Sequence, residues 1–401
     1  MRIMQSKSFT HRFWYIMFLT FLLSVFYIVA TKISYLVDVP NSDFFTFWLS
    51  GYLTSEGKNP YDGPTWIAGH HQFQANWIPN ATFIYPVQIA LLFVPLGILS
   101  PFQAYIVWNV LLQLLIISSV LVIMKIYTGR WINHYYLPII ACVAIFRPTV
   151  VSLINGQISA LLLFIVALIM VFWERGKWKT GAALMAFLAL KPNLGVPIIL
   201  LLSVYLILQK RTSSLAVGVT SGLLLTLVGW LQNPNWIIDF WNAGNTKLSQ
   251  IFGYAPNIWG VATRVCGFNM NCAISIGGVF SLLIIAAYML FIIKESDGIS
   301  PSLVVSLAVV IMLLVTPSCW PYDQVLLIAP ITFLVLKLAN LGYPYMPVVL
   351  IFFTLDTAAW ALLGLAVLTG TDFLTSLVPF SVLCLIVWHI YSSRLIASLA
   401  T

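Results

Sequence analysis

The sequence contains very little charge. Of its 401 residues only 11 are acidic and 19 are Lys or Arg, so charged residues make up 7% of the chain. Soluble globular proteins carry roughly 25%, so this scarcity excludes a soluble globular domain. Instead, 61% of the residues are hydrophobic, in recurring runs of about 20 residues, enough to cross a hydrocarbon core roughly 30 Å thick. We therefore predict an all-α polytopic membrane protein.

Two other patterns are also missing. The alternating segments of about 10 residues that build a membrane β-barrel are absent, and the chain shows no sequence repeat or low-complexity segment. Apolar segments lie near 14–36, 84–99, 102–126, 135–153, 157–173, 178–190, 194–209, 212–232, 273–293, 301–316, 323–339, 345–367 and 373–393. They predict 11 to 13 transmembrane helices, with 12 favoured, in a single integral membrane domain over 1–401.

The basic residues orient these segments. Most Lys and Arg residues fall at alternate segment ends, which the positive-inside rule places in the cytoplasm. The first span follows a basic start without a small-residue cleavage site, so we interpret it as a retained signal anchor in the plasma (cytoplasmic) membrane. The outer side then holds a first outer loop, 37–83, and a second large outer loop, 233–272. The short, proline-containing stretch 84–99 is either re-entrant or shifts the orientation after it. The net charge of +8 reflects the excess of Lys and Arg in the cytoplasmic loops. It does not indicate binding to nucleic acid.

Cysteine and histidine are too few and too scattered to predict a metal centre. The chain has five of each, and the pair His70–His71 has no further ligand at a useful spacing. Cys266 and Cys272, in "RVCGFNMNC", are either a disulfide of an oxidising compartment or two free thiols. We predict no metal and no cofactor. A weak divalent-metal site remains open; its carboxylates would be Asp38, Asp43 and Asp323.

Acidic residues are gathered in one place. The stretch "VDVPNSDFFTFWLSGYLTSEGKNPYD" (37–62) contains Asp38, Asp43, Glu56 and Asp62. Ser42 is placed to be an N-cap, with Asp43 in the first turn of the following helix. Aromatic residues at 44, 45, 47, 48 and 52 predict that this helix lies in the membrane interface. The segment 233–252 predicts a second interfacial helix on the outer side.

Three charged residues lie near membrane depth. Arg147 and Lys191 each stand beside a proline between two apolar segments, in "IFRPTV" and "ALKPNLG", and Asp356 lies inside a late span. Charges at such depth are costly and usually belong to a functional site. Arg147 and Lys191 are therefore candidate site residues on the outer face, whereas Asp356 has no assigned role.

Several stretches, in order, resemble a known family. They are "GKNPYD" (57–62), "FIYPVQIALLFVPLGILS" (83–100), "NGQISALLLFIVAL" (155–168), "LALKPNLGVPIILLL" (188–202), "PNIWGVATRV" (256–265) and "TPSCWPYDQVLLIAP" (316–330), preceded by Asp43-Phe44. Together they resemble the polyprenol-phosphate-mannose-dependent mannosyltransferases of glycosyltransferase family 87, within the GT-C superfamily. The resemblance covers roughly 40–335.

The resemblance implies a GT-C fold and a function. Such an enzyme moves a sugar, by default mannose, from a polyprenyl-phosphate donor to an acceptor hydroxyl at the outer membrane face, inverting the anomeric centre. The acceptor would be a lipid-linked glycan or a glycolipid, as in cell-envelope glycan biosynthesis. The expected partners are therefore this donor, this acceptor and membrane lipids, with no nucleic acid.

The chemistry of transfer distributes roles among the candidate residues. A carboxylate must take the proton of the acceptor hydroxyl, and the leaving phosphate needs fixed cations. The superfamily's catalytic Asp corresponds to Asp43, with Asp38 as the alternative. The phosphate-binding candidates are Lys191, Arg264 and Arg147. The sugar- or acceptor-binding candidates are Asn155, Gln157, Tyr322 and Trp320.

The sequence departs from the family at one position. Members often carry a His in the stretch matching "SCWPYDQ", where this chain has Tyr322 and Asp323. We therefore predict that Asp323 replaces that His, as a third catalytic candidate.

Two other functions are alternatives to the transferase. One is a secondary transporter or lipid flippase that uses Asp356, Lys191 and Arg147 as a proton or substrate path, and the other is a non-catalytic scaffold. The lack of two similar halves and the gathered acid favour the transferase.

Overall fold

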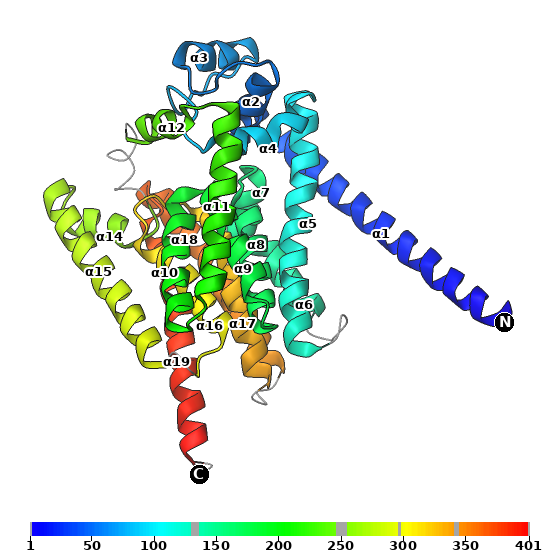
Figure 1. Ribbon diagram of the computed structural model, residues 1–401, viewed down its shortest axis with the longest axis vertical. Coiled ribbons are helices and arrows are strands. Elements are labelled where there is room, and N and C mark those ends of the chain that lie inside the picture. Colours follow the sequence, from blue (N-terminus) through cyan, green and yellow to red (C-terminus); the bar gives the residue numbers. More distant parts are fainter. Residues whose placement is uncertain (1, 130–135, 246–254, 296–297, 341–344, 400–401) are drawn as a thin grey trace.

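The computed structural model describes residues 2–129, 136–245, 255–295, 298–340 and 345–399 (Figure 1). Most of the chain in these ranges is helical, and they contain no strand. The α-helices are α1 Arg2–Leu36, α2 Asp43–Ser55, α3 Gly63–Gln72, α4 Val87–Gly97, α5 Pro101–Thr128, α6 Tyr136–Ile145, α7 Arg147–Ile154, α8 Ser159–Glu174, α9 Trp178–Met185, α10 Pro192–Leu208, α11 Thr212–Gln232, α12 Trp236–Asn245, α14 Ile258–Val265, α15 Met270–Glu295, α16 Pro301–Val315, α17 Ile328–Asn340, α18 Tyr345–Thr369 and α19 Leu377–Leu399. The 3-10 helices are η1 Val39–Asn41, η2 Ala186–Leu190, η3 Pro321–Leu327 and η4 Phe373–Ser376.

The helices confirm an integral membrane protein. Within the described ranges, seven helical segments are long and apolar enough to span a membrane, and a bent pair, α6 with α7, forms an eighth candidate. Five shorter apolar helices lie among them. The number of crossings, 12, stays a prediction. The segment predicted at 84–99 is represented by α4, which has 11 residues and at 1.5 Å per residue reaches only about 16 Å.

A cap of helices covers one end of the molecule. Figure 1 shows α2, α3, α4 and α12 at this end, while both termini point away from it. Phe44, Phe45, Phe47 and Trp48 of α2 are buried and Tyr52 is half-buried, whereas the helix predicted to lie in the membrane interface would present these side chains to lipid headgroups. Close approach of α2 and α4 explains the difference, because a methyl group on Gly51 would lie 2.4 Å from the backbone of Phe93. By contrast, α12 exposes Ile237, Ile238 and Trp241, as an interfacial helix would. The remainder of that predicted helix, 246–252, lies outside the described residues.

The span predicted at 135–153 is broken. Its two pieces, α6 and α7, meet at an angle of 56°, and Phe146 between them has a non-helical backbone, with a φ of −57° and a ψ of 121°. Side chains of α18 form hydrogen bonds with the backbone groups on both sides of the break. The indole Nε1 of Trp360 donates to the carbonyl of Ile145 at 2.8 Å, and Asp356 accepts the backbone N–H of Arg147. Broken helices at membrane depth require such partners, so Asp356 has a structural role that its sequence context did not reveal.

Cys266 and Cys272 form a disulfide between α14 and α15, which resolves the two alternatives left by the sequence. Disulfides persist in oxidising compartments. We expect a membrane-impermeant maleimide added to intact cells to label both cysteines only after reduction. The variant Cys266→Ser/Cys272→Ser is the control for the exposed free thiol of Cys384. Equal labelling with and without reductant would contradict the disulfide.

Candidate active site

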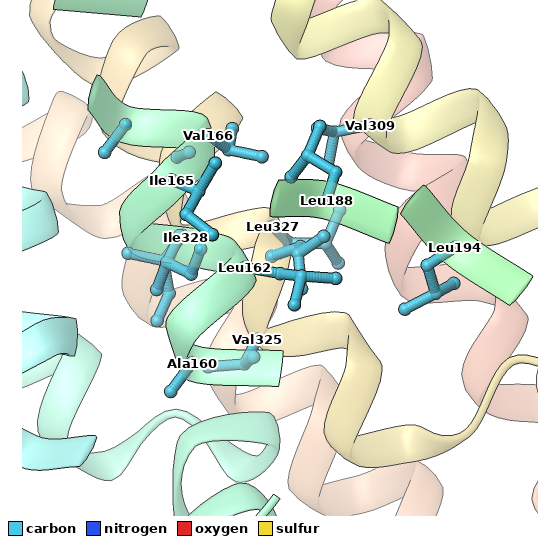
Figure 2. Close-up of a cluster of buried hydrophobic side chains, with 14 of the residues drawn as sticks. Ala160, Leu162, Ile165, Val166, Leu188, Leu194, Val309, Val325, Leu327 and Ile328 are labelled. Atoms are coloured by element: carbon cyan, nitrogen blue, oxygen red, sulfur yellow. The ribbon is translucent and has the colours of Figure 1, made fainter. Parts of the chain in front are cut away.

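Packing of the core brings three polar residues together. Figure 2 shows the apolar cluster in which α8, η2, α10, α16 and η3 meet. Its members include Ala160, Leu188, Leu194 and Val325. Ser159 precedes Ala160, Lys191 lies between Leu188 and Leu194, and Asp323 lies two residues before Val325. Because the cluster holds these helices in place, it also fixes the positions of Ser159, Lys191 and Asp323.

Lys191 and Asp323 form a buried ion pair. The ammonium Nζ lies 2.5 Å from Asp323 Oδ1, and the two side chains are 3% and 0% exposed. The Ser159 hydroxyl donates to the same carboxylate oxygen at 2.6 Å and accepts from Lys191 at 3.0 Å. The backbone N–H of Trp320 donates to Asp323 Oδ2 at 2.9 Å. Both carboxylate oxygens are thus hydrogen-bonded, which is the condition under which a buried pair is tolerated.

Gln157 connects this pair to a second carboxylate. Its Nε2 donates to Asp43 Oδ2 at 2.7 Å, and its Oε1 accepts from Lys191 at 3.4 Å. Gln157 is fully buried, whereas Asp43 is partly exposed at the first turn of α2. Ser42 is the N-cap, as predicted, but its hydroxyl bonds to the carbonyl of Val39 and not to the helix. We name Asp43, Gln157, Ser159, Lys191 and Asp323 the central network.

Two tyrosines border the central network. Lys191 Nζ lies 4.7 Å from the ring centroid of Tyr322, within cation–π range. Tyr85, which the sequence did not single out, is hydrogen-bonded to Gln157. Burial raises the pKa of the Tyr85 phenol well above its ordinary value, and the nearby carboxylates of Asp43 and Asp323 raise it further. Tyr85 therefore presents a neutral hydroxyl to the network.

The turn that carries Gln157 is held by α5. Trp108 Nε1 donates to the carbonyl of Gly156 at 2.8 Å, and Asn109 Nδ2 donates to that of Leu153 at 2.7 Å. The Tyr105 hydroxyl donates to the carbonyl of Ile154 at 2.7 Å. These three side chains satisfy the end of α7 inside the membrane domain. One signal for them is visible in the sequence, namely polar and aromatic residues one turn apart in the apolar run "YIVWN".

Gly156 joins this turn to α2. Its φ is +59°, and a methyl group there would lie 2.7 Å from Phe44 Cβ. We expect Gly156→Ala to lower the free energy of unfolding by about 1–3 kcal/mol, because a residue other than glycine is strained at positive φ. The activity that the sequence resemblance implies should fall further, since a shift of about 1 Å in a positioning group can cost about 100-fold in rate.

Gly129→Ala is the matched control for that substitution. Gly129 has a φ of +67° and no atom within 4 Å of its added methyl group. Thermal melting and the activity of the two variants separate backbone strain from displacement of Phe44. Equal activity of the two variants would contradict a positioning role for the turn.

Arg147 lies outside the central network. Its guanidinium donates to Asp372 Oδ1 at 2.9 Å, and the Arg147 side chain is only 4% exposed. Helix α7, which begins at Arg147, packs against η3, so this ion pair lies on elements that neighbour Asp323.

The remaining candidates are not brought into the network either. Asp38 is exposed and accepts from Asn41 at 2.7 Å. Asn155 Nδ2 donates back to Val151 of its own helix at 2.9 Å. The Arg264 guanidinium stacks over Phe268, with its Cζ 4.6 Å from the ring centroid.

The described part of the chain contains no group of three His, Cys, Asp or Glu side chains that could hold a metal ion. His70 is buried, and its Nδ1 is hydrogen-bonded to the carbonyl of Trp66 at 2.9 Å. The two carboxylates of the central network, Asp43 and Asp323, are instead connected by Lys191 and Gln157.

Comparison with known proteins gives one match. The model of glycosyltransferase family 87 matches residues 83–317, more than half of the chain. No curated protein and no solved structure matches the chain. The matched range contains Gln157, Ser159 and Lys191, whereas Asp43 precedes it and Asp323 follows it. Folding brings these two carboxylates to the matched residues.

Proposed function

Because the chain belongs to glycosyltransferase family 87 and is a membrane glycosyltransferase, we propose that it transfers a sugar, by default mannose, from a polyprenyl-phosphate donor. The acceptor is a hydroxyl of a lipid-linked glycan or a glycolipid. The proposal places the protein in the plasma membrane with its active site on the extracytoplasmic side. The disulfide between Cys266 and Cys272 supports an oxidising compartment on one side of that membrane.

The observation that carries the proposal is the link from Asp43 through Gln157 to Lys191. Asp43 is the partly exposed carboxylate of the network, so it is the one that an acceptor can reach. In the proposed reaction Asp43 takes the proton of the acceptor hydroxyl as its oxygen attacks the anomeric carbon. The bond from that carbon to the phosphate oxygen breaks on the opposite face, and the phosphate leaves with the electron pair. The product is inverted.

Lys191 is proposed to stabilise the leaving phosphate. Its contact with Gln157, at 3.4 Å, is the longest of its three hydrogen bonds. A phosphate oxygen is a stronger acceptor than an amide oxygen because it is charged. We therefore expect a phosphate to replace this contact while the ion pair with Asp323 persists.

An apolar groove beside Lys191 supports a lipid-linked donor. The cavity has a volume of about 460 Å³ and is formed by α9, η2, α10, α11 and α12. Leu190 and Pro192, the chain neighbours of Lys191, line it, as does Pro86 next to Tyr85. A polyprenyl chain lying in this groove would place its phosphate beside the Lys191 ammonium.

The test is transfer by the purified protein in liposomes. Radiolabelled polyprenyl-phosphate-mannose is offered together with a lipid extract from the host. We expect label to move into a new lipid or polymer. Polyprenyl-phosphate carrying glucose or a pentose, tested in parallel, identifies the donor sugar. Absence of transfer from every donor would overturn the proposed function.

A further inference from the structure

A second cavity lies at the end of α18, away from the donor groove. It is an open depression at the surface, with a volume of about 480 Å³. Its lining includes Leu363, Ala366 and Val367 of α18, Asp372 in the following turn, and Trp320. The Val367 side chain is 75% exposed, so it stands at the rim of the cavity.

The polar groups of this cavity suit a carbohydrate. Asp372 is 29% exposed, and its Oδ1 is held by the buried Arg147 guanidinium. The pair neutralises its own charge, so the cavity does not select an anion. A carboxylate accepts several hydrogen bonds at once, as vicinal hydroxyls require. The partly exposed Trp320 adds a large flat apolar surface with a defined orientation, which can cover the C–H face of a sugar ring.

We propose that this cavity binds the terminal sugar of the acceptor, with Trp320 against the ring and Asp372 accepting from its hydroxyls. The assignment rests on the proposed transferase function. Trp320 lines the cavity, and its backbone N–H is bonded to Asp323 of the central network. The donor groove, by contrast, is lined by residues of α9 to α12, and it includes Leu190 and Pro192, the chain neighbours of Lys191. The two substrates would thus approach the network from different sets of helices.

The apolar wall explains how a glycolipid acceptor would lie. Leu363 and Val367 line the cavity one turn apart on α18, so their apolar side chains lie on one face of this helix. The alkyl part of the acceptor would run along this apolar side of α18, while its sugar enters toward Asp372.

Thiol labelling tests binding without turnover. Val367→Cys and Leu368→Cys are made separately with Cys384→Ala, because Cys384 is exposed while the other two free cysteines are buried. Each protein is labelled with a maleimide in lipid nanodiscs, with octyl α-mannopyranoside, octyl β-glucopyranoside or octanol added.

A sugar at about ten times its Kd leaves about a tenth of the sites free. We expect an octyl glycoside to slow labelling at Val367→Cys about tenfold, with no effect of octanol and no effect at Leu368→Cys. Equal slowing by octanol, or no slowing by either glycoside, overturns the proposal.

The transfer assay separates this inference from the proposed function. Val367→Trp should fill the mouth of the cavity and raise the KM for acceptor while leaving that for donor unchanged. Leu368→Trp is the matched control with the same added bulk outside the cavity. An unchanged acceptor KM in Val367→Trp, with an active wild type, refutes the acceptor site alone. A wild type without transfer refutes the proposed function, and the labelling experiment then still decides whether the cavity binds sugar.

Discussion

Replacing Asp43 by asparagine is expected to lower the rate of sugar transfer by about 10²- to 10⁴-fold, the contribution of a positioned general base. The amide cannot take the proton of the acceptor hydroxyl, because it lacks a basic oxygen at neutral pH. The loss should appear in kcat with little change in donor binding, since Asp43 acts on the acceptor in the proposed mechanism.

The fold should survive this substitution. Asparagine keeps the shape of the side chain, and its oxygen can still accept from Gln157 Nε2, which donates to Asp43 Oδ2 at 2.7 Å. The charge at the first turn of α2 contributes about 0.3–1 kcal/mol through the helix dipole. A thermal melt close to that of the wild type is therefore expected, and it separates loss of chemistry from loss of structure.

Two controls locate the base. Glu56→Gln makes the same change at the exposed, opposite end of α2 and should leave transfer unaltered. Asp38→Asn removes the alternative base, an exposed carboxylate that accepts from Asn41. If Asp38→Asn abolishes transfer and Asp43→Asn does not, the assignment of the base is wrong.

The sequence predicted the membrane class and the family, because both depend on composition and on the order of short motifs. It also singled out Asp43, Gln157, Lys191 and Asp323 individually. It did not predict that they form one network, since Asp43 and Gln157 are 114 residues apart and Lys191 and Asp323 are 132 apart. Contacts at such separations are set by helix packing, which hydropathy does not record.

Gln157 illustrates what such contacts change. The sequence placed it among the sugar- or acceptor-binding candidates. In the structure both ends of this amide are occupied, one by Asp43 and the other by Lys191. Its proposed role is therefore to orient the base.

The helix break at Arg147 was only partly visible in the sequence. The segment 135–153 has the composition of one span, and only Pro148 hinted at the bend between α6 and α7. The groups that stabilise the bend, Asp356 and Trp360, lie more than 200 residues later. Asp356 therefore resembled a transport residue in the sequence, whereas in the structure it accepts a backbone N–H.

Removing either partner of the Lys191–Asp323 pair is expected to cost about 3–5 kcal/mol of stability, because the remaining charge is buried without its counter-ion. In Lys191→Met the carboxylate keeps only Ser159 and the N–H of Trp320 as partners. In Asp323→Leu the ammonium keeps Ser159 and Gln157. Both single variants should melt well below the wild type, and both should lose transfer.

The double variant Lys191→Met/Asp323→Leu separates structure from chemistry. Replacing a whole buried pair by apolar groups of similar volume is often neutral or stabilising by about 1–4 kcal/mol, so its melting temperature should recover. Transfer should not recover, because no cation then remains beside the donor phosphate and Gln157 loses the partner that holds its Oε1. Recovery of both properties would mean that the pair only holds helices together, and the phosphate role would pass to Arg147 or Arg264. Recovery of stability alone would make the charged pair part of the reaction, since the change common to the three variants without transfer is the loss of the Lys191–Asp323 pair.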